Sequence, residues 1–350
     1  MVPQALQPRW IQGFFTAFQD VTDLFADLFP AEPAKDIGSH INYDLLAYSR
    51  MRGLMNTRTG PPQSAESYTM GTMDVEAETW REKIIIGSEV FSDEREPGQA
   101  TGMNGQAEVE RNTIALRNRF ATFQNWLRAE ALQGIKEYFP AGTASEMWEL
   151  LLCSDTCIVD EVLYDWSTVP ADEATARLTL MAIEADIRTA RAALAAAGAQ
   201  ATDVYLNGVT MGYVEDNASM AGAGPLQEYV SRQVAESGMV TRWLGLNWHV
   251  VDNTYVQPIV GVTVPYIDDD VVIVVDSNNA RAGRSMIECN PEDKDATAAG
   301  TRGIYFYEPY KSVEPPWIWT VAGEWTGQPI IALPCSEYVF QDVTNEGNGM

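Results

Sequence analysis

The sequence contains few of the side chains with which enzymes and metal sites work. It has two histidines, His40 and His249, in 350 residues. Of its four cysteines, two are separated by three residues and two are isolated, so no zinc or redox spacing is present. We therefore expect buried free thiols at the four positions, which are Cys153, Cys157, Cys289 and Cys335.

Basic residues are also scarce. The chain carries 23 Lys and Arg against 49 Asp and Glu, a formal net charge of -26 at pH 7. Binding to nucleic acid irrespective of sequence requires Lys and Arg to neutralise phosphates, so this balance argues against such a role. The acidity is consistent with high-salt surroundings or with a surface that does not adhere to nucleic acid, and the sequence does not decide between them.

Long apolar runs are missing as well. No stretch approaches the roughly 20 apolar residues of a membrane span. The first residues, MVPQALQPRWIQGFF, lack the basic segment and cleavage site of a signal peptide. We expect a protein that is made and kept in a cytoplasm, with no membrane partner. Its length and its 46% hydrophobic content allow two or three domains.

The strongest periodic pattern predicts one long helix over residues 106–139. Its apolar positions recur at intervals of three, four or seven, and charged residues occupy the other face. Such a helix would extend on the order of 50 Å and would act as a spine. The apolar stripe consists of Val109, Leu116, Phe120, Phe123, Leu127, Ala131, Ile135 and Tyr138.

Residues 1–49 have the pattern of an arm. Aromatic residues at helical spacing, from Phe14 and Phe18 to Phe25 and Phe29, end at Pro30. A helix this aromatic must be covered, either by its own domain or by a neighbouring subunit, and we favour the neighbour.

Residues 63–105 read as an extended segment with strand-like runs and too few apolar residues for a core of its own. It is either a mobile surface hairpin or a strand pair stabilised on another subunit, and we favour the second. The side chains expected to be buried there are Tyr68, Trp80 and Phe91.

Beyond the spine, the patterns alternate between helices and strands. A strand is expected within 157–166, a helix over 173–198 with Gly198 at its C′ position, a strand over 202–208 and a short helix over 209–217. A further helix over 225–238 and successive strands to residue 275 complete an α/β domain spanning about 174–284. Residues 285–350 return to β character, with prolines expected to keep the strands short or at edges.

The search for chemistry finds little. No G-x-S-x-G, H-E-x-x-H or G-x-x-x-x-G-K-[ST] pattern occurs. His249 and Asp252 are three residues apart on an expected strand and so point to opposite faces, which makes a poor catalytic pair. The acidic run Asp268, Asp269 and Asp270 lacks the spacing of a calcium loop, and we interpret it as a solvated turn.

The order of these parts resembles the major capsid proteins of tailed phages, which share the fold first described for a Hong Kong phage, and more narrowly the lambda-type major capsid protein E family. The motif LRAEALQGIKEYF is similar to the family's spine end R-x-E-x-x-x-A-L-x-x-G but reads R-x-E-A-L-x-G here. The likeness covers about 300 residues. The other motifs that resemble the family are RMRGLMNTRTG (50–60), IVDEVLYDW (158–166), DVYLNGVTMGYVEDN (203–217) and VPYIDDDVVIVVD (264–276).

The resemblance implies an α+β fold with four parts: an N-terminal arm (1–49), an extended β-hairpin E-loop (50–105), a peripheral domain with the spine helix (106–173 and 285–350) and an inserted α/β axial domain (174–284). It implies a protein that is not an enzyme, uses no cofactor and assembles through hexamers and pentamers into the icosahedral head of a double-stranded DNA phage. Portal, scaffolding and decoration proteins are the partners expected in addition to other copies.

The same resemblance locates the contacts between copies on the arm and the E-loop. Some relatives join a loop lysine to a neighbour's asparagine, and Lys83 is the only lysine in this loop, although pairing with a carboxylate is its ordinary role. Two alternatives stay open: an encapsulin-type compartment of the same fold, and an α/β enzyme centred on residues 174–284. The assembly contacts predicted are Phe14, Phe18, Phe25, Tyr68, Trp80, Lys83 and Phe91.

Overall fold

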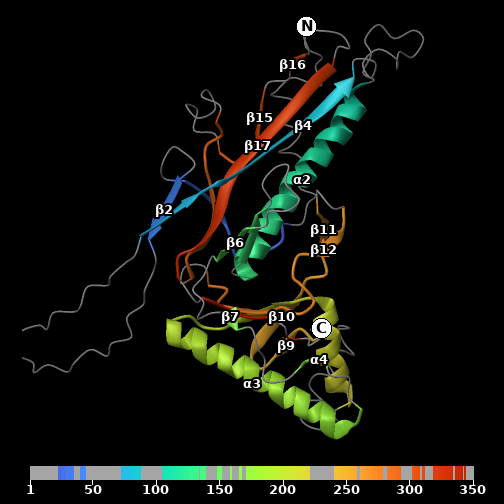
Figure 1. The fold of residues 1–350 in the computed structure, drawn as a ribbon, viewed down its shortest axis with the longest axis vertical. Helices are drawn as coiled ribbons and strands as arrows, with labels where there is room; N and C mark the ends of the chain where they lie inside the picture. The colour runs from blue at the N-terminus through green and yellow to red at the C-terminus, as the bar shows by residue number, and fades with distance from the viewer. Residues whose placement is uncertain are drawn as a thin grey trace, which may run out of the picture. The chain divides into compact units, whose positions relative to one another are not determined.

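A computed structural model of the chain describes somewhat more than half of its residues (Figure 1). They divide into two units: unit 1 consists of residues 1–42, 74–128 and 286–329, and unit 2 of residues 43–73, 129–285 and 330–350. The described residues are 23–34, 40–44, 72–87, 105–133, 135–138, 148–151, 158–159, 165–167, 171–220, 240–257, 261–278, 282–292, 302–307, 310–311, 318–333, 336–341 and 343.

Unit 1 is built on a sheet whose centre is the long strand β17 (Ile318–Ile331). β4 (Glu78–Gly87) runs antiparallel to it in a register from Ile318 opposite Gly87 to Gly327 opposite Glu78. Figure 1 shows these two strands side by side along the helix α2. The other strands of the sheet are β1 (Ala31–Pro33), β14 (Arg284–Glu288), β15 (Tyr305–Phe306) and β16 (Tyr310–Lys311).

The helix α2 (Gly105–Gln133) covers one face of this sheet through aromatic contacts. The ring of Trp80 on β4 meets that of Phe123 at a centroid distance of 4.4 Å, and Phe120 contacts Phe306 of β15 at 6.4 Å. A Cβ on Gly323 of β17 would lie 3.0 Å from the Phe120 ring of α2, so glycine at this position lets the helix and sheet approach this closely.

The spine-helix prediction is confirmed for 106–133 and wrong for its last residues. Residues 135–138 form the strand β5 (Ile135–Tyr138), which pairs antiparallel with β6 (Trp148–Leu151). The sequence gives a reason for the early end, because Gly134 weakens the helix and Ile135 and Tyr138 are residue types that favour strands.

Unit 2 contains a second sheet in the order β7-β18-β13-β8-β10-β9. The parallel pairing of β8 with β10 and the antiparallel pairing of β8 with β13 make a mixed sheet. The strands expected within 157–166, over 202–208 and up to residue 275 are confirmed. They are β7 (Ile158–Val159), β8 (Asp203–Leu206), β9 (Arg242–Trp243), β10 (Leu246–Val250) and β13 (Val272–Val275). The sixth strand of the sheet is β18 (Glu337–Phe340).

Two helices accompany this sheet. α3 (Glu173–Ala197) begins after Asp172, whose carboxylate accepts the backbone N–H of Thr175 at 2.7 Å, and ends at Gly198 with φ +99°. Both ends agree with the sequence prediction, since a carboxylate cap and a left-handed glycine satisfy the free backbone groups of helix termini. α4 (Gly208–Met220) follows β8 as expected. The helix expected over 225–238 lies outside the described residues.

One expectation for the C-terminal region is wrong. β17 is 14 residues long and contains Pro329, although prolines were expected to keep strands short. Pro329 is tolerated because it lies beyond Gly327, the last residue paired with β4. β18, in the segment 285–350 that was expected to belong to the peripheral domain, pairs antiparallel with β13 and parallel with β7. All four of its residues are buried, as a strand inside a sheet requires.

Two further pairs of strands complete the described chain. β11 (Thr254–Val256) and β12 (Thr263–Pro265) form a two-stranded antiparallel hairpin within unit 2. β2 (His40–Asp44) pairs with β3 (Thr72–Glu76). Within the described residues, no helix is both long and apolar enough to cross a membrane.

The described end of the arm, residues 23–34, is tied into unit 1. The helix expected through Phe29 is instead a series of turns over 24–28, with Phe25 at φ +60°. Phe25 and Phe29 are both buried in the chain itself. The buried guanidinium of Arg128 donates to the carbonyl oxygen of Leu24 at 3.4 Å, and β1 runs parallel to β14. A positive φ at a phenylalanine disfavours helix, and the burial of the rings stabilises the turn in its place.

Candidate functional site

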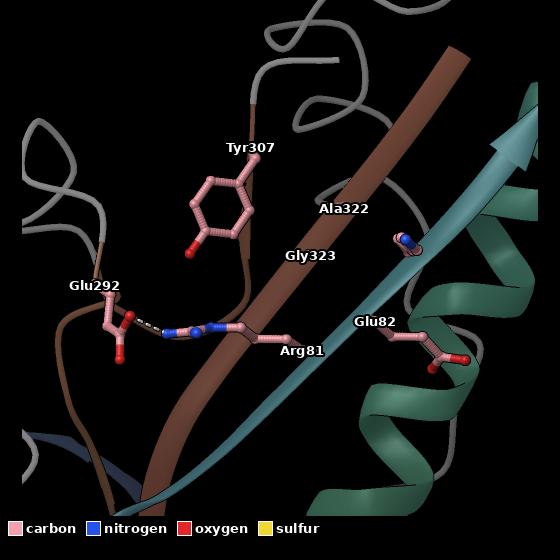
Figure 2. Close-up of a pocket in the computed structure, with 7 residues that line it drawn as sticks. Arg81, Glu82, Glu292, Tyr307, Ala322 and Gly323 are labelled. Carbon is pink, nitrogen blue, oxygen red and sulfur yellow. Dashed lines mark ion pairs between the residues drawn. The ribbon is translucent and has the colours of Figure 1, made fainter. Parts of the chain in front are cut away.

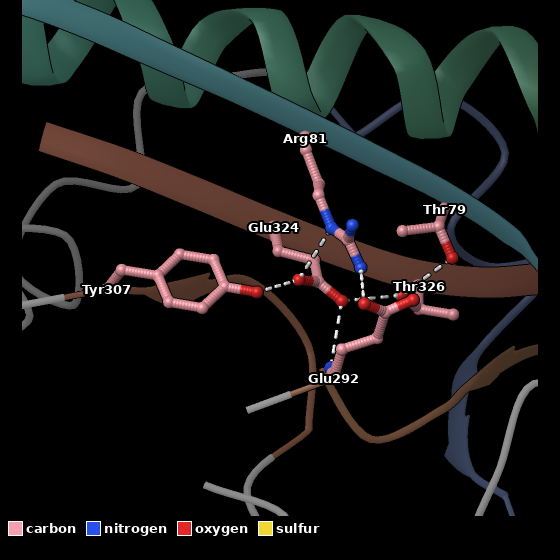
Figure 3. A network of polar contacts seen from close by, with 6 residues as sticks. All are labelled: Thr79, Arg81, Glu292, Tyr307, Glu324 and Thr326. Carbon is pink, nitrogen blue, oxygen red and sulfur yellow. Dashed lines mark hydrogen bonds and ion pairs between the residues drawn. The ribbon is translucent and has the colours of Figure 1, made fainter. Parts of the chain in front are cut away.

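The face of the unit 1 sheet opposite α2 carries a polar network that is centred on Glu324 of β17 (Figure 3). The Glu324 side chain is fully buried and faces Arg81 across the strand pair. Arg81 Nε donates to its Oε2 at 3.0 Å, and the backbone N–H of Glu292 donates to its Oε1 at 3.0 Å. The Tyr307 hydroxyl donates to the same carboxylate, and the Thr326 hydroxyl lies 3.3 Å from Oε1.

These donors determine the protonation of the network. Burial would raise the pKa of Glu324, but the hydrogen bonds from Tyr307, from the Glu292 backbone and from Arg81 outweigh it, and its pKa lies below the usual range. The pKa of Tyr307 is raised by burial and by its bond to Glu324. Glu324 is therefore an ionised acceptor at neutral pH, with its donors fixed around it.

Beside the network lies an open pocket of about 550 Å³ (Figure 2). Arg81 reaches its edge and forms an ion pair there with Glu292. Glu82, which also lines the pocket, pairs with Arg119 of α2. Acidic and basic groups alternate around the pocket, so it has no strong preference for one sign of ligand. Its lining residues are Arg81, Glu82, Lys83, Glu292, Tyr307, Ala322 and Gly323.

The structure places three of the seven predicted assembly residues. Phe25 is buried at the foot of the arm, Trp80 packs on α2, and Lys83 is exposed at the pocket. These three side chains have separate surroundings and form no common site. Phe14, Phe18, Tyr68 and Phe91 lie outside the described residues.

The hypothesis that the loop strand pairs on another subunit is wrong for β4. Ten residues of β4 pair with β17 of the same chain. By itself the segment has too few apolar residues for a core. β17, about 240 residues away in the chain, supplies the other half of the pairing.

His249 and Asp252, which were not expected to form a catalytic pair, have different hydrogen-bond partners. His249 Nε2 lies 2.8 Å from Asp203 Oδ1, and its ring stacks on Tyr205 at 4.7 Å. Asp252 accepts the backbone N–H of Gly208, at the start of α4, at 2.9 Å.

The Asp203 carboxylate receives several hydrogen bonds. Burial would raise its pKa, but hydrogen bonds from His249, Thr202, Ser277 and Asn247 together bring it far below the usual range. A carboxylate held this strongly in its ionised form would serve poorly as a proton acceptor.

The acidic run at 268–270 forms the turn before β13, as the sequence indicates. Its backbone carbonyls are used within the chain: Asp270 O accepts the N–H of Val343 at 2.9 Å, and Asp269 O accepts the Thr210 hydroxyl. Burial and the neighbouring Asp270 and Asp269 raise the pKa of Asp268. In the described part of the chain, no three His, Cys, Asp or Glu side chains are grouped so that they could hold a metal ion.

Sequence reasoning missed a buried ion pair in unit 2. Arg284 is fully buried and donates to the Asp276 carbonyl oxygen at 2.5 Å and to the Ser336 carbonyl oxygen at 2.7 Å. Its Nε lies 3.5 Å from Glu337 Oε2, and neither Glu337 oxygen has a hydrogen bond. Burial raises the pKa of Glu337 to about 7, although Arg284 opposes this. Nothing in the sequence indicated that these two charges, 53 residues apart, would meet.

Comparison with known proteins identifies the fold. No family model matches the sequence, and no curated protein matches it significantly. Among solved structures, a protein of E. coli CFT073 described as a prophage capsid protein has a TM-score of 0.59 and 14% sequence identity, over 96% of this chain and 99% of that one.

Two other solved structures superpose less closely. The capsid structure of the cyanophage P-SCSP1u has a TM-score of 0.49 and 10% identity, over 91% of this chain and 88% of that chain. The SrpI encapsulin of Synechococcus elongatus PCC 7942 has a TM-score of 0.45 and 7% identity, over 100% and 94%. Of these three structures, the E. coli prophage protein superposes well enough to define a shared fold. The chain has the mixed α+β fold of phage capsid proteins, as the sequence predicted.

Proposed function

We propose that this chain is a major capsid protein, which assembles with copies of itself into a closed icosahedral shell. One observation carries the proposal: the likeness to the prophage capsid protein runs over nearly the full length of both chains. A shared inserted domain would leave large parts unmatched. Because the match covers both chains from end to end, the whole subunit, and not one domain of it, resembles the prophage capsid protein.

The charge supports the same function. A shell that encloses double-stranded DNA should not adhere to it, and a net charge of -26 gives each subunit a surface that repels phosphate. We propose a tailed-phage head of the lambda type, assembled in the host cytoplasm from hexamers and pentamers and present in the virion. Portal, scaffolding and decoration proteins are its proposed partners.

The domain assignment is part of the proposal. We assign unit 1 to the peripheral domain and unit 2 to the axial domain. This moves residues 129–173 and 330–350 to the axial side, in agreement with the pairing of β18 with β13. Residues 1–22 and 50–71 are assigned to the arm and the E-loop.

The proposed contacts between copies change accordingly. Phe14, Phe18, Tyr68 and Phe91 stay assigned to contacts between copies, and Lys83 is kept as an exposed candidate. Trp80 and Phe25 are reassigned to the interior of the subunit, since both pack within the chain.

The proposal is tested by electron microscopy and sedimentation of the purified protein. Uniform closed shells are expected. A stable monomer or dimer at high concentration and in varied salt would contradict the proposal. The contents of particles made in a host separate the two kinds of shell: nuclease-resistant double-stranded DNA indicates a phage head, and an enclosed enzyme indicates an encapsulin-type compartment.

A further inference from the structure

The hairpin formed by β11 and β12 lies in unit 2 as a two-stranded sheet, and Val256 and Val262, the two described apolar residues nearest its turn and here called its tip, are exposed. Val256, the last residue of β11, is 59% exposed, and Val262, just before β12, is 51% exposed. These are two of only seven large apolar side chains that are exposed in the described part of the chain.

The register places the two valines on opposite faces of the hairpin. Tyr255 is paired with Val264 and Val256 with Thr263, so Tyr255 and Val256 point to opposite sides. Val262 lies on the Tyr255 side, since it is two residues from Val264. Each face of the tip therefore exposes an apolar residue. Tyr255 and Val264, farther from the turn, are half-buried, and a two-stranded hairpin is marginal by itself.

The base of the hairpin is fixed, in contrast to its tip. Tyr266 is buried, its N–H donates to the Asn253 carbonyl oxygen at 3.1 Å, and its carbonyl oxygen accepts Gln133 Nε2 at 3.0 Å. Asn207 Nδ2 donates to the next carbonyl oxygen, that of Ile267, at 3.2 Å. The subunit thus holds the hairpin at its base and leaves its apolar tip uncovered.

Charge indicates what covers the tip. Residues 253–267 contain no Asp, Glu, Lys or Arg, in a chain with 72 such residues and a net charge of -26. Identical acidic subunits repel one another except where carboxylates are absent, so this hairpin is a place where two copies can approach. A basic partner of another kind would instead be attracted by the carboxylates elsewhere on the surface.

From this we infer that the tip of the β11–β12 hairpin, through Val256 and Val262, is a contact by which one copy of the chain binds another. The inference rests on the proposed function, in which copies associate. It adds a contact in a segment that the sequence analysis assigned to the axial domain and to no interface.

The test replaces both valines and measures association of the purified full chain. In Val256→Asp/Val262→Asp, two carboxylates enter the contact, and the protein concentration needed for assembly should rise at least about tenfold, since each buried valine contributes roughly that factor. Val256→Thr/Val262→Thr keeps the shape and should give a smaller rise. Light scattering and sedimentation velocity measure the threshold, while circular dichroism and urea unfolding check the fold.

Val209→Asp is the matched control, because Val209 is 48% exposed on α4, outside the hairpin, and should leave the threshold unchanged. A folded Asp variant that assembles at the wild-type threshold overturns the inference and leaves the proposed function intact. If the Asp variant fails to fold, the threonine variant decides by the same criterion.

If the wild-type protein forms only small oligomers and the hairpin variants are monomeric, the proposed shell function is overturned and the proposed hairpin contact is supported. Wild-type protein that stays monomeric overturns both.

Discussion

At the scale of single residues, two buried carboxylates have opposite surroundings. Glu324 is surrounded by donors from Arg81, Tyr307, Thr326 and the backbone of Glu292. Glu337 has only the Arg284 guanidinium, at 3.5 Å, and no hydrogen bond. Because a buried charge is costly unless it is hydrogen-bonded, the first favours its ionised form and the second its neutral form.

Glu324→Gln should destabilise unit 1. The amide group would direct its N–H₂ at groups that donate to Glu324 and would leave buried polar atoms unpaired. We expect the free energy of unfolding to fall by about 2 kcal/mol. The control is Glu292→Gln, since that side chain is 74% exposed and its ion pair should contribute less than about 0.5 kcal/mol. Equal effects of the two substitutions in urea unfolding would contradict this account.

Glu337 predicts a dependence of stability on pH. Burial raises its pKa from 4.5 to about 7, so folding binds a proton between these values. The contribution to stability is fully present below pH 4.5 and is lost as the pH rises through about 7. Between about pH 5.5 and pH 8, the free energy of unfolding should fall by about 2 kcal/mol on this account.

Glu337→Gln should remove that part of the slope, because the amide does not titrate. The measurement is urea unfolding of both proteins across the pH range. A variant with an unchanged pH slope would show that another group is responsible.

At the scale of elements, β4 belongs to the interior of the subunit. Trp80→Ala should lower the free energy of unfolding by about 2 kcal/mol, because the half-buried ring packs on Phe120 and Phe123 of α2. Ile85→Ala on the same strand is the control, since Ile85 is 56% exposed and should change stability by less than about 0.5 kcal/mol.

Urea unfolding of the soluble proteins measures both substitutions. A neutral Trp80→Ala would mean that β4 does not pack on α2. For the same reason, a deletion of Pro62–Gly102 that removes β4 should disrupt unit 1 rather than affect assembly alone.

At the scale of the whole molecule, the net charge of -26 determines how copies respond to salt. Charges on neighbouring subunits repel wherever they are not paired. The screening length is about 10 Å at 0.1 M salt and about 3 Å at 1 M. Shells should therefore form at lower protein concentration, and dissociate less, as ionic strength rises. Light scattering at fixed pH measures this, and dissociation of shells with added salt would contradict it.

The sequence by itself determined the elements whose signals are local. The spine helix as far as Gln133, α3 with its end at Gly198, β8 and α4 follow from periodicity and from a capping glycine close by in the chain. The acidic balance and the lack of catalytic motifs were also read directly. These elements depend on interactions between residues within a few positions of each other, and a short stretch of sequence is therefore enough to predict them.

Only the tertiary structure decided which strands meet. β4 pairs with β17 about 240 residues later, and β18 joins β13 instead of the sheet of unit 1. The Glu324 network and the Arg284–Glu337 pair exist only because of such pairings. An alternating pattern predicts a strand that must pair with another strand, but it does not identify the partner. Backbone hydrogen bonds are alike in every strand and so do not distinguish one partner from another. The choice depends on side-chain packing between distant segments, such as Trp80 against Phe123.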